Sequence, residues 1–543
     1  MKTDRWLWVL AGLAVIAVAV WFRTWQLGSQ ILIDDEWHAV HKILWTEHWS
    51  EIFFSFGHAD YSIPLTLLFN ALATTVGLTE WQMRALPLTF GLATVVLVPW
   101  LLRPWLKREA MLLLAALLAV SPVLIHFSRY VRPYALVLPL GFMAVIALWR
   151  WWHERDRRWL AVYVPCAVLA GWLHPLTLLF TGSAMLYFIL RAAWMKLHQG
   201  DWSGLKRVIP AGALTLLPVL ALVLPPLLAD PAAMQSKAGV HHVQLETLVW
   251  AWHLVLGTAC APAMVVLTLL ALVGAVRLWR RDPAFCGYWL FMGATAVVVV
   301  AALQPAWIHH ALVLLRYVLV AVPMVFMLLA LGMEAVVGFA AARLRGPARA
   351  SWVPLTVVLI LVVHATTGPL AYTYSGLNPF TNHARYYFDF DYERNVFDQL
   401  MRAIEVPEVY RTMAREPGRW EIVQGPWWFE SNYNQIAELQ RQTQMPVRIG
   451  MISGLCTRWT HGELRAAGGP DIRFRRFVHF RDLLEVTGEV NRFIVLVRPE
   501  TFGNERKLPG TSACIDAFRD RYGAPWYEDG QRVIFRVPAG DSD

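Results

Sequence analysis

Long apolar runs separated by short basic segments constrain this chain more than any other feature of its sequence. A membrane-spanning helix needs about 20 predominantly apolar residues, and we count about eleven such runs before residue 370. The predicted spans centre on Leu7–Phe22, Arg84–Leu102, Ala110–Ile125, Tyr134–Trp149, Leu160–Trp172, Leu176–Leu190, Val208–Leu228, Ala261–Ala275, Phe285–Leu303, Leu315–Met333 and Trp352–Pro369. Only 16% of the 543 residues are charged, against about 25% in soluble proteins. The sequence therefore predicts a polytopic α-helical membrane protein.

The loops between the runs predict its orientation. Lys and Arg concentrate in alternate loops, such as residues 103–108 and 277–281, and such loops face the cytoplasm. This pattern places the N-terminus in the cytoplasm, and the first loop (residues 23–83) and everything after Pro369 outside. A further span at Ile63–Gly77 would move every later loop to the opposite side of the membrane and place the basic loops outside. We therefore expect an interfacial helix, or a hairpin that does not cross, at Ile63–Gly77. Because topology accounts for the net charge of +9, no nucleic-acid partner is predicted.

The chain becomes polar after Pro369, which predicts two domains, residues 1–370 and 371–543. The segments RWEIVQGP and PVRIGMIS read as strands, with a helix, WWFESNYNQIAELQRQ, between them. RFIVLVRP and QRVIFRVP read as further strands. We therefore expect a soluble α/β domain on the outer side. Cys456 and Cys514 lie in it. Outside the cytoplasm, where disulfides can form, a disulfide between them and a pair of free thiols are equal alternatives.

Three consecutive acids, Asp34, Asp35 and Glu36, follow the first predicted span. If this segment is helical, Asp35, His38 and Lys42 share one face by their spacing. A carboxylate and a cation on one face suit a site that deprotonates a nucleophile near an anion. The alternative is a solvated interfacial helix whose first acids complement its N-terminal dipole.

A second group of residues is a candidate anion-binding site. Arg129 and Arg132 are three residues apart with tyrosines beside them, and guanidinium groups bind phosphate bidentately. The alternative is a pair of snorkelling arginines in an aromatic belt. The predicted phosphate-binding residues are Arg129, Arg132, Tyr130, Tyr134, Arg316 and Lys42. The predicted substrate-binding residues near outer span ends are His58, Asp60, Arg84, His174, His309 and His310.

The order of these motifs resembles one enzyme superfamily over roughly residues 1–370. The acidic trio is followed by SIPLTLLFN, WQMRALPLTFGLATVVLVPWLL, SRYVRPYAL and RYVLVAVP. This order is similar to that of GT-C glycosyltransferases that use a polyprenyl-phosphate sugar, in the bacterial protein O-mannosyltransferase and aminoarabinose transferase branch. Many relatives have His-Pro-Pro-Leu where this chain has residues 62–65 as Ser-Ile-Pro-Leu, which leaves that histidine's role unassigned here, although His58 lies close by.

The resemblance implies a GT-C-like fold in the bacterial inner membrane. It implies an inverting transfer of a sugar from a polyprenyl-phosphate donor to an acceptor lipid, glycan or protein outside. The family's acid matches Asp35, with Glu36 as its partner and Asp34 as the alternative one residue earlier. No cofactor is required if arginines balance the leaving phosphate, and a divalent metal stays open. A flippase of lipid-linked sugars and a diphosphate-lipid-linked glycan ligase remain as alternative functions.

Overall fold

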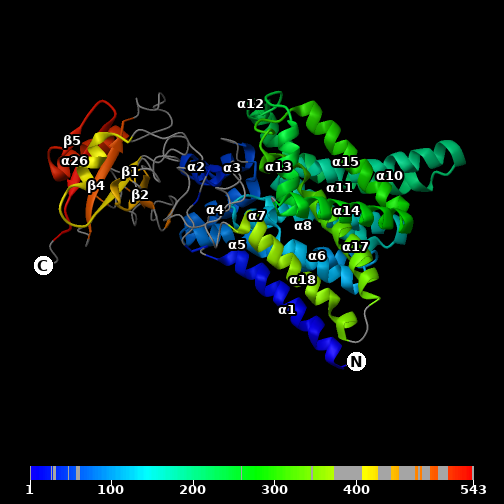
Figure 1. Ribbon diagram of the computed structural model, residues 1–543. Helices are drawn as coiled ribbons and strands as arrows, with labels where there is room; N and C mark the ends of the chain where they lie inside the picture. The colour runs from blue at the N-terminus through cyan, green and yellow to red at the C-terminus, as the bar shows by residue number, and fades with distance from the viewer. Residues whose placement is uncertain are drawn as a thin grey trace. The chain divides into compact units, whose positions relative to one another are not determined.

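The structure is a computed structural model (Figure 1). It describes residues 2–25, 27–28, 32, 34–46, 48–56, 61–235, 237–258, 260–343, 347–371, 406–425, 439, 442–451, 471–474, 477–479, 483, 490–498 and 511–540. The chain divides into two compact units, and each is described by itself. The helical unit comprises Met1–Gly28, Ser50–Leu65 and Arg84–Phe390. The sheet unit comprises Ser29–Trp49, Thr66–Met83 and Asp391–Asp543.

Within the described residues, eight helical segments are long and apolar enough to cross a membrane. They are α1 (Lys2–Thr24), α5 (Glu80–Leu102), α8 (Tyr134–Glu154), α10 (Leu178–Gln199), α11 (Ser203–Ala229), α14 (Ala261–Arg281), α15 (Pro283–Leu303), and one segment made of α16 (Ala311–Val318), η3 (Leu319–Ala321) and α17 (Val322–Ala341). A ninth is the pair α6 (Arg108–Val120) and α7 (Pro122–Arg129), bent by 55°. The chain is a multi-pass membrane protein.

The remaining predicted spans also fall on helices. Two are shorter: α9 (Arg157–Leu173) has 17 residues, and the apolar part of α18 (Pro347–Thr367) is Trp352–Thr367. The expected interfacial segment is α4 (Ile63–Thr75), a short apolar helix. An apolar helix that the sequence analysis did not predict is α13 (Leu245–Leu256). The other short helices are η1 (Asp34–Glu36), α2 (Trp37–Trp45), α3 (Trp49–Phe54), η2 (Pro175–Thr177) and α12 (Pro231–Gln235).

Two glycines allow α14 and α17 to pack at backbone distance. A Cβ atom on Gly274 would lie 1.8 Å from the carbonyl oxygen of Leu328, and one on Gly332 would lie 1.9 Å from that of Leu270. Because lipid tails are as apolar as Leu, membrane helices associate through close packing at small residues. These two positions therefore need glycine for the contact that the helices make.

In the part of the sheet unit that the structure describes, six strands form one sheet in the order β3-β2-β1-β4-β6-β5. They are β1 (Trp420–Gly425), β2 (Val447–Met451), β3 (Phe477–His479), β4 (Asn491–Val497), β5 (Tyr527–Glu528) and β6 (Arg532–Val537). β1 is parallel to β2 and β4, β2 is parallel to β3, and β6 is antiparallel to its neighbours. The four predicted strands are confirmed, and the parallel pair β1–β2 agrees with the predicted β-α-β unit. Most of the predicted helix 427–442 lies outside the described residues.

Apolar side chains cover both faces of this sheet, which is typical of a largely parallel sheet. On one face Phe493 and Val495 pack with Tyr410 and Met413 of α21 (Glu408–Ala414). On the other face, strand residues pack against Phe518 of α26 (Thr511–Tyr522). The C-terminal region is thus an α/β domain. The predicted boundary at residues 370 and 371 stays a prediction, because residues 372–405 lie outside the described part.

A short segment after α4 also belongs to the sheet unit. Leu78 forms a parallel bridge with Ile472. The amide of Leu78 donates to the carbonyl of Asp471, and the amide of Arg473 donates to the carbonyl of Leu78, each at 2.7 Å. Two regions almost 400 residues apart in sequence are therefore joined by main-chain hydrogen bonds.

Candidate functional site

The predicted phosphate-binding motif SRYVRPYAL lies where the broken span meets α8. Arg129 ends α7, and a tight turn follows, in which the amide of Arg132 donates to the carbonyl of Tyr130 at 2.7 Å. Arg129, Tyr130, Arg132 and Tyr134 are all buried within the helical unit. Burial of both guanidinium groups does not fit arginines that snorkel to the membrane surface.

Tyr134 brings together side chains from three distant parts of the sequence. The guanidinium carbon of Arg316, on α16, lies 5.1 Å from the centre of the Tyr134 ring. The ring of His174, between α9 and η2, lies 5.5 Å from the same ring. The sequence predicted all three as binding residues, and the structure places Arg316 and His174 against Tyr134.

Tyr61 joins this group, and Asp230 lies close enough to Tyr61 to affect its pKa; neither residue was predicted from the sequence. The rings of Tyr61 and His174 are 6.4 Å apart. Burial raises the pKa of Tyr61 to about 12, while nearby Arg132 lowers it and nearby Asp230 and Tyr134 raise it. The phenol therefore stays protonated at neutral pH and can donate a hydrogen bond. A single tyrosine in a loop carries no motif that would have revealed it.

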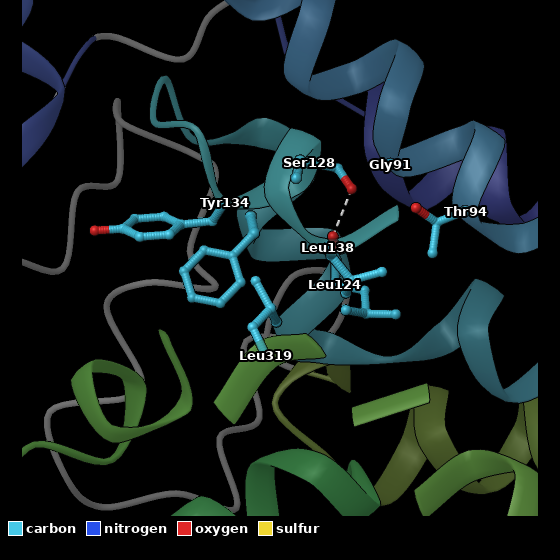
Figure 2. Close-up of a pocket in the computed structure, with 9 residues that line it drawn as sticks. Gly91, Thr94, Leu124, Ser128, Tyr134, Leu138 and Leu319 are labelled. Carbon is cyan, nitrogen blue, oxygen red and sulfur yellow. Dashed lines mark hydrogen bonds between the residues drawn. The ribbon is translucent and has the colours of Figure 1, made fainter. Parts of the chain in front are cut away.

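We call Tyr61, Arg132, Tyr134, His174 and Arg316 the arginine–tyrosine cluster. A small, largely apolar cavity adjoins it at Tyr134 (Figure 2). The cavity is lined by Gly91, Thr94, Leu124, Phe127, Ser128, Tyr134, Ala135, Leu138 and Leu319. Figure 2 shows the Tyr134 hydroxyl directed away from the leucine side chains. The cluster is thus polar and its neighbouring cavity is not.

Two other predicted ligand residues make main-chain contacts. Arg84 donates through Nε to the carbonyl of Arg129 at 3.2 Å. Arg129 donates through Nη1 to the carbonyl of Phe22 at 3.3 Å. Both side chains are almost fully buried. These contacts hold the end of α7 in place.

The acidic segment belongs to the sheet unit. Asp34 begins η1, and its side chain lies outside the described residues. Nε2 of His38 lies 3.7 Å from Oδ1 of Asp35, so the predicted shared face of these two residues is confirmed. Glu36, His38 and Lys42 are buried. Glu36 occupies the N-cap position of α2, and its side chain makes no capping hydrogen bond.

His309 and His310 form a separate aromatic group with His241 and Trp307. The ring of His309 lies 4.3 Å from that of His310 and 4.5 Å from that of His241. The amide of Trp307 donates to Nδ1 of His241 at 3.0 Å. The structure therefore brings the two predicted histidines together, with Trp307 and His241 as added neighbours.

Three predicted residues, His58, Asp60 and Cys456, lie outside the described residues. Cys514 is disulfide-bonded, and Cys166, Cys260 and Cys286 are free. The pairing of Cys514 with Cys456 stays a prediction. Among the residues that the structure describes, no three His, Cys, Asp or Glu side chains are grouped so as to hold a metal ion.

Comparisons with known proteins find similar solved structures. No family model and no curated protein matches the sequence. The chain is similar to the crystal structure of ArnT from Cupriavidus metallidurans bound to undecaprenyl phosphate, with 14% identity and a TM-score of 0.46 over 98% of both chains. It is also similar to the apo state of that protein, with 13% identity and a TM-score of 0.39 over 97% of both chains.

Proposed function

We propose that this protein is an inverting glycosyltransferase of the GT-C type that uses a polyprenyl-phosphate sugar. The observation that carries the proposal is the arginine–tyrosine cluster. A cation buried in a membrane helix bundle costs about 2.5–3.5 kcal/mol or more. Arg316 lies over the ring of Tyr134, and Arg132 lies close enough to Tyr61 to lower its pKa. An anionic ligand would stabilise the guanidinium groups of Arg132, which is buried, and of Arg316, which is half-buried.

A phosphate on a lipid suits this cluster in charge and in surroundings. Guanidinium groups bind phosphate oxygens in pairs of parallel hydrogen bonds. The protonated phenol of Tyr61 supplies a further donor. The surrounding apolar helices favour a phosphate that carries a hydrocarbon chain over a free, fully hydrated one.

The proposed chemistry is a single displacement. The acceptor hydroxyl attacks the anomeric carbon and forms the new C–O bond, while the bond from that carbon to the phosphate oxygen breaks. The electron pair leaves with the lipid phosphate, whose charge Arg132 and Arg316 stabilise. Asp35 takes the acceptor proton as general base, and His38 at 3.7 Å orients it. Glu36 is the proposed partner acid.

We place the site on the outer face of a bacterial inner membrane, with the N-terminus in the cytoplasm. The basic loops support this orientation. The disulfide of Cys514 supports an oxidising compartment for the C-terminal domain. The acceptor is an outward-facing lipid, glycan or protein.

The test is sugar transfer from a polyprenyl-phosphate donor by purified protein. Asp35→Asn should lower the transfer rate by at least ~10²-fold, the lower range for a positioned base. Glu51→Gln is the matched control, because Glu51 is an exposed acid of the same loop. Near-normal transfer by a folded Asp35→Asn variant would remove Asp35 from the mechanism.

A flippase is the second candidate, because the α6–α7 pair is bent by 55° and discontinuous helices are a feature of transporters. A flippase moves the lipid-linked sugar without cleaving it. Mass spectrometry of the lipid product separates the candidates. Free polyprenyl monophosphate indicates the transferase, a diphosphate indicates a glycan ligase, and intact donor in the opposite leaflet indicates a flippase.

A further inference from the structure

We infer that Arg23 is a positioning residue that sets the angle between the two halves of the broken span and thereby places the loop of Arg129–Arg132. That this loop binds a lipid phosphate rests on the proposed function. The placement of the loop by Arg23 does not.

The break in the span leaves main-chain carbonyl groups at the end of α6 without the helical partners that a continuous helix would supply. α6 ends at Val120, and α7 begins at Pro122, which has no N–H to donate. Unsatisfied carbonyl groups in an apolar membrane interior cost several kcal/mol each. A bend at this position therefore needs donors from elsewhere in the protein.

Arg23, in the last turn of α1, supplies those donors. It donates to the carbonyl of Ala119 at 2.8 Å and to that of Leu118 at 3.0 Å. The side chain is fully buried. Its positive charge at the C-terminal end of α6 is also favourable toward the helix dipole.

The same guanidinium group reaches the second half of the span. Nε of Arg23 donates to Oγ of Ser128 on α7 at 3.2 Å. α5 packs directly on this serine, because a Cβ on Gly91 would lie 2.0 Å from its Oγ. One side chain thus connects the last turn of α6 with the last turn of α7 and holds the angle between them.

Neighbouring hydrogen bonds connect Arg23 to the loop of Arg129–Arg132. The carbonyl of Phe22, next to Arg23, accepts from Nη1 of Arg129. Nε of Arg84 donates to the carbonyl of Arg129. Three residues later lies Arg132 of the arginine–tyrosine cluster. A change of the α6–α7 angle would therefore move that cluster's arginine.

The experiment compares the full-length protein with Arg23→Met, which keeps the length of the side chain and removes its donors. Hydrogen exchange is measured by mass spectrometry in detergent. Binding of undecaprenyl monophosphate is measured by native mass spectrometry. Arg23→Lys, which keeps the charge, is the conservative variant. Arg103→Met is the control, because Arg103 is exposed.

We expect faster exchange in Arg23→Met that is confined to residues 118–133. We also expect lipid-phosphate affinity to fall by at least ~10-fold, because a displaced Arg132 would lose a hydrogen bond to a charged phosphate, which corresponds to about tenfold or more in affinity. Arg23→Lys should restore part of the affinity. If Arg23→Met does not fold, Ser128→Ala, which removes only the link to α7, should show the same local exchange with a smaller loss of affinity.

The inference would be overturned if residues 118–133 of Arg23→Met exchanged at the wild-type rate. It would also be overturned if the exchange rate rose evenly over all helices. Faster local exchange with unchanged affinity, in a protein whose wild type binds the lipid, would overturn it as well. A wild type that does not bind undecaprenyl monophosphate would instead contradict the proposed function. In that case the exchange data still decide the role of Arg23.

Discussion

Arg316 lies over the ring of Tyr134, with 5.1 Å between the guanidinium carbon and the ring centre. The two residues are 182 positions apart in the sequence (316 minus 134) and belong to different membrane segments. A cation over an aromatic face is stabilised by about 0.5–2 kcal/mol, and a guanidinium group in this position carries a charge that attracts an anion. This relationship leads to the first prediction.

We expect Arg316→Ala to raise the donor KM by roughly 10–100-fold, because a hydrogen bond to a charged group is worth about 1.5–3 kcal/mol. Arg316→Lys should recover part of the loss, since it keeps the charge but not the paired donors. Donor titrations of the transfer rate check this. Tyr134→Phe, which keeps the ring, should leave the donor KM closer to normal, and an unchanged KM in Arg316→Ala would exclude Arg316 from phosphate binding.

The second prediction concerns the protonation of Tyr61. Its pKa is about 12 instead of the ordinary 10, so the neutral phenol is favoured in the folded protein. The stability that this group contributes is therefore complete below pH 10 and is lost as the pH rises toward 12. The difference in tyrosinate absorbance between wild type and Tyr61→Phe should show a step near pH 12. A step near pH 10 would show that Tyr61 is not in the buried position described.

The third prediction tests the segment that joins Leu78 to Ile472. Gly77 has a φ of +87°, and a Cβ there would lie 2.7 Å from Nε of Arg473. Gly77→Ala should lower the unfolding free energy by about 1–2 kcal/mol for the left-handed backbone and by about 1–3 kcal/mol more for the steric conflict. Gly523→Ala is the matched control in the same unit, because its φ is +77° but nothing lies within 4 Å. Thermal unfolding should separate the two variants, and equal losses would show that the steric conflict contributes nothing.

The fourth prediction concerns a charge in the sheet. Glu421 on β1 is buried and accepts from Nε of Arg448 on β2 at 2.8 Å and from Nε of Arg492 on β4 at 2.6 Å. Glu421→Gln should cost about 2–3 kcal/mol. This is below the ~3–5 kcal/mol of fully buried pairs, because the side chain of Arg448 is 42% exposed. Denaturant unfolding measures the cost. Glu408→Gln removes the surface pair with Arg411 and should cost less than ~1 kcal/mol. A similar cost in both variants would contradict a special role for Glu421.

The fifth prediction concerns the disulfide of Cys514. Peptide mapping without reduction should recover a fragment that links Cys514 to Cys456. Cys514→Ser should destabilise the C-terminal domain by about 2–5 kcal/mol, and Cys260→Ser, at a free thiol, should not. Linkage of Cys514 to any other cysteine would show that the predicted pairing is wrong.

The sequence by itself determined the features that depend on local composition. Apolar length alone located every predicted span on a helix, because a helix in a bilayer satisfies its main-chain hydrogen bonds internally. The four predicted strands were found for the same kind of reason, since short runs of β-branched and apolar residues bounded by turn residues favour strands. The motif SRYVRPYAL was also recognisable, because its arginines and tyrosines are close together in the chain.

Only the tertiary structure decided which of these residues meet. The sequence placed Arg129 and Arg316 in one functional set, but it gave no signal for Tyr61, or for Arg23 at the break between α6 and α7. Such contacts come from the packing of helices that are distant in sequence, and the periodicity of one helix carries no information about its neighbour. The bend at Pro122 shows the same limit: the proline marks a break, whereas the donors that hold the angle come from α1. Local composition therefore predicts the elements, and packing between them decides the site.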